Sequence, residues 1–248
     1  MAATETQSKE YNGCGGNLVL SSGKAKAGDK DHTDCSRSTP TTPVVWDTAV
    51  CKKLQVPYTY RKVAALIVHW ADYLDTQLPC GDEIRDLQDV FTNQYHFKTK
   101  TLILDDKINP QLKLRSGIDQ FVLENEGPHH SNLLIVYYTG HGRDSGADGL
   151  TIIGERQMGY SDFLALFNAS ANWKRAEESL VNEAHADVLT ILDCCCAGSI
   201  MKGKPAEDAR TYEVLAATPR KKATEAPGPL SFTRALIDVL KASAEKPD

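Results

Sequence analysis

A short apolar run, Val188–Leu192, ends abruptly in small and polar residues and leaves few folds open to the chain. Its side chains are β-branched or aliphatic, and Asp193, three consecutive cysteines and Ala-Gly-Ser follow it. A continuous apolar run of this length is typical of a strand that is buried on both faces of a parallel sheet. Open α/β sheets carry their chemistry at the carboxyl ends of such strands. The run therefore predicts a buried strand with thiols at its tip.

The same pattern recurs and alternates with amphipathic stretches. The further strands that we expect are Val63–Trp70, Lys100–Leu104, Leu133–Thr139, Leu150–Ile153 and Tyr212–Ala217. Helices are expected over Asp82–Tyr95, from Asn109-Pro110 to the break at Gly127, from Ser161-Asp162, over Trp173–Ala184 and over Ser231–Ala242, and a glycine-rich loop over Gly140–Gly149. Alternating strands and helices predict an α/β fold with a three-layer α-β-α arrangement and a mostly parallel central sheet.

Composition bounds the domain organisation and the class of partner. The 248 residues, 41% of them hydrophobic, fit one domain over residues 58–248 behind a largely disordered tail over residues 1–57. A net charge of -5 argues against nucleic acid or an anionic membrane as a partner. No apolar run approaches the roughly 18 residues of a membrane-spanning helix, and the amino terminus lacks a secretory signal. Seven cysteines, three of them contiguous, indicate a reducing compartment, the cytoplasm or the nucleus.

A histidine lies at the tip of a second predicted strand. Leu133–Thr139 runs into Gly140, His141 and Gly142. Neighbouring parallel strands end at the same edge of a sheet, so we expect His141 to lie near the cysteine trio, where it forms a Cys–His pair with Cys195. The backbone N–H groups of Gly142 and Cys195 are then the natural donors to an oxyanion. The pattern predicts nucleophilic catalysis on an amide carbonyl.

The two tips also carry a family resemblance. Tyr137-Tyr-Thr-Gly-His-Gly142 and Asp193-Cys-Cys-Cys-Ala-Gly-Ser199 resemble the two catalytic blocks of the caspase and metacaspase superfamily, and the wording is closest to fungal caspase-like proteins. The resemblance implies a caspase-like cysteine endopeptidase with His141 and Cys195 as its dyad. It implies a part like the large subunit over residues 58–200 and a part like the small subunit over residues 211–248. Because family members continue into one more strand, we expect the chain to be truncated at its carboxyl end.

The resemblance extends to specificity, calcium and self-processing. Metacaspases cleave after Arg or Lys through acidic pocket residues. Asp193 matches one of them, and the other falls near Glu83, where the family has Asp, so we expect protein or peptide substrates cut after a basic residue. Many metacaspases need calcium, but Asp144, Asp148, Glu155 and Asp162 match no aspartate cluster of the family, and we expect no required cofactor or metal. The polar stretch after the nucleophile offers Lys202 and Arg210 as self-cleavage sites, with Lys204, Lys174 and Arg175 ranked behind them.

Other functions remain open at this point. A caspase-fold adaptor without catalysis, and a separase-like or CHAT-type protease with narrow specificity, are compatible with the same fold. Retention of both His141 and Cys195 with their glycines argues against the adaptor. Regulated proteolysis or programmed cell death is the setting that the resemblance implies, with a larger parent protein or a regulatory partner among the candidate partners.

Overall fold

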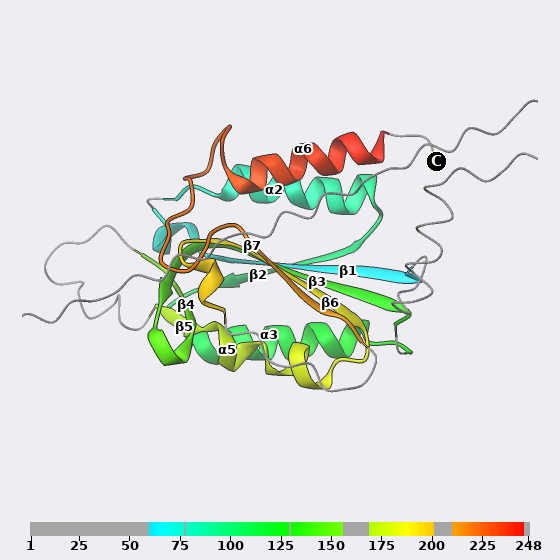
Figure 1. The fold of residues 1–248 in the computed structure, drawn as a ribbon, viewed down its shortest axis with the longest axis horizontal. Coiled ribbons are helices and arrows are strands. Elements are labelled where there is room, and N and C mark those ends of the chain that lie inside the picture. The colour runs from blue at the N-terminus through cyan, green and yellow to red at the C-terminus, as the bar shows by residue number, and fades with distance from the viewer. Residues whose placement is uncertain (1–59, 77, 129, 156–168, 201–209, 246–248) are drawn as a thin grey trace, which may run out of the picture. The chain divides into compact units, whose positions relative to one another are not determined.

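A computed structural model gives the fold, and it describes residues 60–76, 78–128, 130–155, 169–200 and 210–245. Five strands of its sheet are parallel and follow the order β2-β1-β3-β6-β7. They are β1 (Lys62–Trp70), β2 (Lys98–Leu104), β3 (Asn132–Asp144), β6 (Asp187–Cys194) and β7 (Tyr212–Ala216). Helices α2 (Gly81–Asp89) and α6 (Phe232–Ala244) cover one face, and α3 (Pro110–Asn125) and α5 (Trp173–Ala176) cover the other (Figure 1). The predicted three-layer α-β-α arrangement is confirmed.

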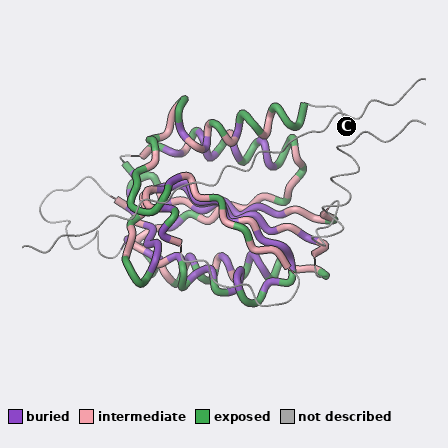
Figure 2. Tube along the Cα trace, viewed as in Figure 1, coloured by how far each residue is buried: buried purple, intermediate pink, exposed green. Residues whose placement is uncertain are grey.

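The two faces of the sheet each bury a hydrophobic core. Along β1, Ala64, Leu66 and Val68 belong to the core that includes α3, whereas Ala65 and Ile67 belong to the core that includes α2. Successive strand residues point to opposite faces, so a strand covered on both sides must be apolar throughout. Figure 2 shows the buried residues concentrated along the central strands and the inner sides of the helices.

The helix starts are set by capping side chains that the sequence predicts. Asn109 accepts a hydrogen bond from the N–H of Leu112 at 3.2 Å, with Pro110 in the first turn of α3. Ser231 accepts one from the N–H of Arg234 at 3.0 Å and so caps α6. At α2 the predicted helix ends differently, because a π-helical turn, η2 (Val90–Gln94), follows Asp89.

Strand β3 continues further than its sequence predicts, and the expected loop over Gly140–Gly149 is wrong in its first half. Up to Gly140, β3 pairs with β6 in parallel, and from His141 onward it pairs with β4 (Leu150–Ile153) in antiparallel. Gly140 lies where the partner changes and has φ 140°, a conformation that favours glycine. The polar residues after Thr139 hide this extension, since its pairing depends on a distant segment. Strand β5 (Ser170–Asn172) then pairs with β4.

The segment between β5 and β6 also departs from the prediction. One polar helix over Trp173–Ala184 is expected, but α5 ends at Ala176 and a separate turn, η5 (Ser179–Glu183), follows. Short 3-10 turns occur at η1 (Asp72–Leu74), η3 (Gly146–Asp148) and η6 (Ala197–Ser199). The predicted tail over residues 1–57 and the helix predicted from Ser161 lie outside the described residues. Within the described ranges, no helix has the length and apolar character needed to cross a membrane.

Candidate active site

The tips of β3 and β6 lie side by side at the carboxyl edge of the sheet. The parallel register pairs Thr139 with Asp193 and Gly140 with Cys194. The next residue is His141 on the β3 side and Cys195 on the β6 side. Paired strands are about 4.8 Å apart. The expected neighbourhood of the two tips is therefore present, and a single register step brings the histidine backbone and the Cys195 backbone together.

The three cysteines have different environments. Cys194 still belongs to β6, is fully buried in the core on the α3 side, and burial raises the pKa of its thiol well above the usual value. Cys195 is the first residue beyond the strand and is partly exposed. Cys196 is also partly exposed and has φ 58°, in the left-handed region. Of these three cysteines, Cys195 and Cys196 are therefore the partly exposed ones, and Cys194 is a core residue.

Hydrogen bonds to the segment after β7 hold the turn that carries these cysteines. The Thr218 hydroxyl donates to the carbonyl of Cys194 at 3.0 Å and accepts from the N–H of Ala197 at 3.2 Å. The N–H of Cys196 donates to the carbonyl of Lys222 at 2.7 Å. The turn is therefore fixed on both sides of Cys195.

Gly142 packs directly against this turn. A Cβ built on Gly142 would lie 2.3 Å from the carbonyl oxygen of Cys195 and 2.8 Å from the Sγ of Cys194. Real Cβ atoms do not approach other atoms so closely, so this contact requires glycine. The close approach places the two predicted oxyanion donors, the backbones of Gly142 and Cys195, next to each other.

A buried chain of hydrogen bonds orients the His141 backbone. The indole N–H of Trp70 donates to the hydroxyl of Tyr138 at 3.2 Å, and that hydroxyl donates to the carbonyl of His141 at 2.7 Å. Both aromatic side chains are buried. The imidazole is mostly buried, and this burial lowers the pKa of His141, with Glu155 acting in the opposite direction. Burial thus favours the neutral form of His141, and the hydrogen-bond chain fixes its backbone.

Glu83 and Asp193 line one narrow pocket beside Gly140. Its other lining residues are Leu78, Cys80, Thr139, Thr224, Glu225 and Pro227. Glu83 accepts hydrogen bonds from the N–H of Gly228 at 2.9 Å and from the hydroxyl of Ser231 at 2.7 Å. Asp193 accepts from the hydroxyls of Thr224 at 3.1 Å and Thr233 at 2.5 Å, and burial raises its pKa. The space inside is about 10 Å³, enough for about one water molecule.

A family model described as the caspase domain of the C14 peptidases matches residues 62–248. The chain belongs to the caspase domain family. A search of curated proteins found no match. Membership supports a cysteine peptidase, a hydrolase that acts on protein substrates, and agrees with the parallel sheet and its helices.

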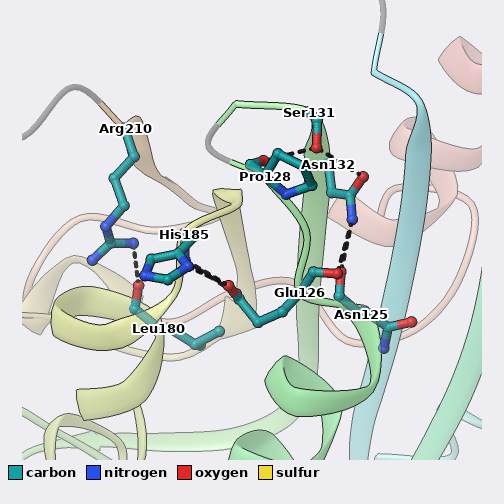
Figure 3. Close-up of polar contacts among 8 residues, drawn as sticks. All are labelled: Asn125, Glu126, Pro128, Ser131, Asn132, Leu180, His185 and Arg210. Atoms are coloured by element: carbon teal, nitrogen blue, oxygen red, sulfur yellow. Dashed lines mark hydrogen bonds and ion pairs between the residues drawn. The ribbon is translucent and has the colours of Figure 1, made fainter.

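The candidate self-cleavage residues of this caspase domain differ in accessibility. Arg210 is half-buried, and its guanidinium donates to the carbonyl of Leu180 at 2.7 Å (Figure 3). It also donates to the carbonyl of Val181. Burial also lowers the pKa of Arg210. This residue anchors η5 and has to leave it before a peptidase can bind its side chain. Lys202 lies outside the described residues.

Of the carboxylates that the sequence offers for calcium, the described ones do not gather around a site. Asp144 accepts from Arg220 at 2.8 and 3.2 Å and from the N–H of Gly146 at 2.9 Å, so both of its oxygens have donors. Asp162 lies outside the described residues. Among the residues described, no group of His, Cys, Asp or Glu side chains is arranged to hold a metal ion. The described acids, Asp144, Asp148 and Glu155, do not fit a calcium ligand set.

Sequence reasoning missed two contributors to the site. Asp75 is not among the predicted site residues, yet its carboxylate lies beside His141. Thr218 directly follows the predicted strand Tyr212–Ala217, and its hydroxyl secures the cysteine turn. Neither has a local signal, because each reaches its partner through the folding of distant segments.

Proposed function

We propose that this caspase domain is a cysteine endopeptidase in which Cys195 is the nucleophile and His141 the general acid and base. The observation that carries the proposal is the register that brings the two residues to adjacent strand tips, with only Cys195 both partly exposed and directly beyond the paired strand. A Cys–His pair of this kind is sufficient for acyl transfer.

The proposed reaction uses groups that lie together at this edge. His141 takes the proton from the Cys195 thiol, and the thiolate attacks the carbonyl carbon of the scissile peptide bond. The N–H groups of Gly142 and Cys195 donate to the oxygen that becomes negative. The protonated His141 then gives its proton to the leaving amine. Water hydrolyses the thioester that remains, which releases the acid product and restores the thiol.

We assign substrate preference to the acidic pocket. Glu83 and Asp193 are both buried in its wall, and the exposed Glu225 lines it as well, so the pocket favours a cationic side chain. Cleavage after Arg or Lys follows. The donors from residues 224–233 close the pocket in this form, so binding a long basic side chain requires this segment to move.

The biological setting of the proposal comes from the family resemblance. We assign the chain to regulated proteolysis of the type linked to programmed cell death, in the cytoplasm, with Lys202 as the first candidate for self-cleavage and Arg210 as the second. The closed pocket and the anchored Arg210 are consistent with a latent form that needs activation.

The test compares Cys195→Ala and His141→Ala with the parent chain on reporter peptides that end in Arg, Lys or Asp. We expect hydrolysis of the Arg and Lys peptides to fall by at least about 1000-fold in both variants. Cys196→Ala is the matched control, since it removes a neighbouring exposed thiol, and should stay within about threefold of the parent. Unchanged hydrolysis in Cys195→Ala overturns the dyad. Preference for the Asp peptide overturns the pocket assignment alone, and a chain that hydrolyses nothing points to an adaptor.

A further inference from the structure

We infer that Asp75 is a positioning residue for His141, whose carboxylate holds the Nε2 side of the imidazole and leaves Nδ1 for the thiol of Cys195. The inference rests on the proposed function and adds a third member to the pair. Neither the family match nor the resemblance assigns Asp75 a role. Three observations support it: the geometry, the burial of both groups, and the rigidity of the segment that carries Asp75.

The geometry places two carboxylates at one nitrogen of the imidazole. Nε2 of His141 lies 3.4 Å from Oδ1 of Asp75 and 3.6 Å from Oε2 of Glu155. These are ion-pair distances without the alignment of a hydrogen bond. Active-site hydrogen bonds are often long before substrate binds and shorten afterwards. A slight rotation of the imidazole completes the bond to Asp75.

Burial makes this pairing valuable. Asp75 is only 6% exposed, and its Oδ1 and the Nε2 of His141 are buried without hydrogen-bond partners among the described residues. An unpaired buried polar atom destabilises the folded chain, because it has lost its hydrogen bonds to water without gaining others. Oδ1 of Asp75 and Nε2 of His141 are neighbours, so each can supply the hydrogen-bond partner that the other lacks.

The backbone around Asp75 is held at the active edge. Asp75 ends the turn η1 directly after β1, its N–H donates to the carbonyl of Asp72 at 3.3 Å, and its own carbonyl accepts from Leu78 at 3.1 Å. Asp75 also forms a β-bridge with Glu155. A Cβ on Gly140 would lie 3.3 Å from Oδ2 of Asp75, so the glycine leaves the space that the carboxylate fills.

The charge of Asp75 decides which tautomer the imidazole adopts. Burial, with the negative charges of Glu155 and Asp72, raises the pKa of Asp75 to about 7. Above that pH the carboxylate accepts from Nε2–H, and the bare Nδ1 takes the proton of Cys195. Below it the protonated acid donates to Nε2, the proton of the imidazole sits on Nδ1, and the base is lost. When Asp75 is ionised, it takes no proton from the imidazole, and its negative charge stabilises the imidazolium instead.

The test measures kcat, KM and the pH profile of the full chain with Asp75→Asn. We expect kcat to fall about 10- to 100-fold with little change in KM, since Asp75 does not contact substrate. The rise of kcat with pH around 7 should disappear, because the amide does not titrate. Glu155→Gln, at a more exposed position, should keep activity and move that rise to lower pH. Asp72→Asn is the control for the same chemical change on the exposed side of the turn. It should also move the rise to lower pH, and it should change kcat on the alkaline plateau by less than about twofold.

A second readout separates this inference from the proposed function. The rate of Cys195 alkylation by iodoacetamide against pH reports thiolate formation without any peptide substrate. Its midpoint should shift to higher pH in Asp75→Asn, whether or not a peptide substrate is found. If both the alkylation midpoint and the pH profile of kcat match the parent chain in Asp75→Asn and Glu155→Gln, Asp75 is a structural residue and the inference is overturned.

Discussion

Replacing Gly142 by alanine tests how tightly the nucleophile turn is fitted to β3. The added methyl group would lie 2.3 Å from the carbonyl oxygen of Cys195, whereas ordinary contacts of carbon are about 3.5 Å. The contact is with backbone, so the turn has to retreat by about 1 Å. Misplacement of a reacting group by about 1 Å costs roughly 100-fold in rate. That factor corresponds to about 2.7 kcal/mol in the activation free energy.

The assay is kcat on an Arg reporter peptide, together with denaturant unfolding. We expect Gly142→Ala to lose about 100-fold in kcat, and overpacking to lower the free energy of unfolding by about 1–3 kcal/mol. Gly81→Ala is the matched control, because its Cβ would meet nothing nearer than Arg85 at 3.8 Å. A Gly142→Ala enzyme with the kcat of the parent chain would refute the argument that this contact positions Cys195.

Three further outcomes are expected. Glu83→Gln keeps an acceptor for Ser231 but removes a charge, so kcat/KM for Arg peptides should fall about 10-fold or more relative to a neutral peptide. Burial raises the pKa of Glu177 from 4.5 to about 7, so the parent chain loses stability as pH rises through that window. Above pH 7 the free energy of unfolding of Glu177→Gln, measured with denaturant, should therefore exceed that of the parent chain by at most about 3 kcal/mol. Sequencing of fragments after incubation should show a cut after Lys202 that is absent from Cys195→Ala.

The sequence predicts the sheet well because its strands are buried on both faces. Val63–Trp70, Leu133–Thr139 and Val188–Leu192 are mostly apolar, and each forms a central strand within a residue or two of those limits, except where β3 continues to Asp144. The placement of His141 near Cys195 follows from parallel pairing alone. Successive side chains of a strand point to opposite faces of the sheet. If the predicted strand is continued to Cys194, this alternation turns its side chain into a covered face, which agrees with its burial.

The parts that escape prediction depend on contacts between distant segments. The extension of β3 beyond Gly140 needs β4 as a partner, and its small, polar residues show no strand pattern. Asp75 lies far before His141 in the chain, and no local pattern links them. The wall of the acidic pocket joins Glu83 to Ser231 in the same way.

Labelling with a peptidyl electrophile that carries a basic residue tests the central claim most directly. Mass spectrometry of the labelled full chain then locates the adduct among the cysteines. We predict one adduct, on Cys195, formed at least about 100-fold more slowly in His141→Ala. An adduct on Cys194 or Cys196, or equal labelling in the presence and absence of the His141 side chain, would contradict the assignment of this site.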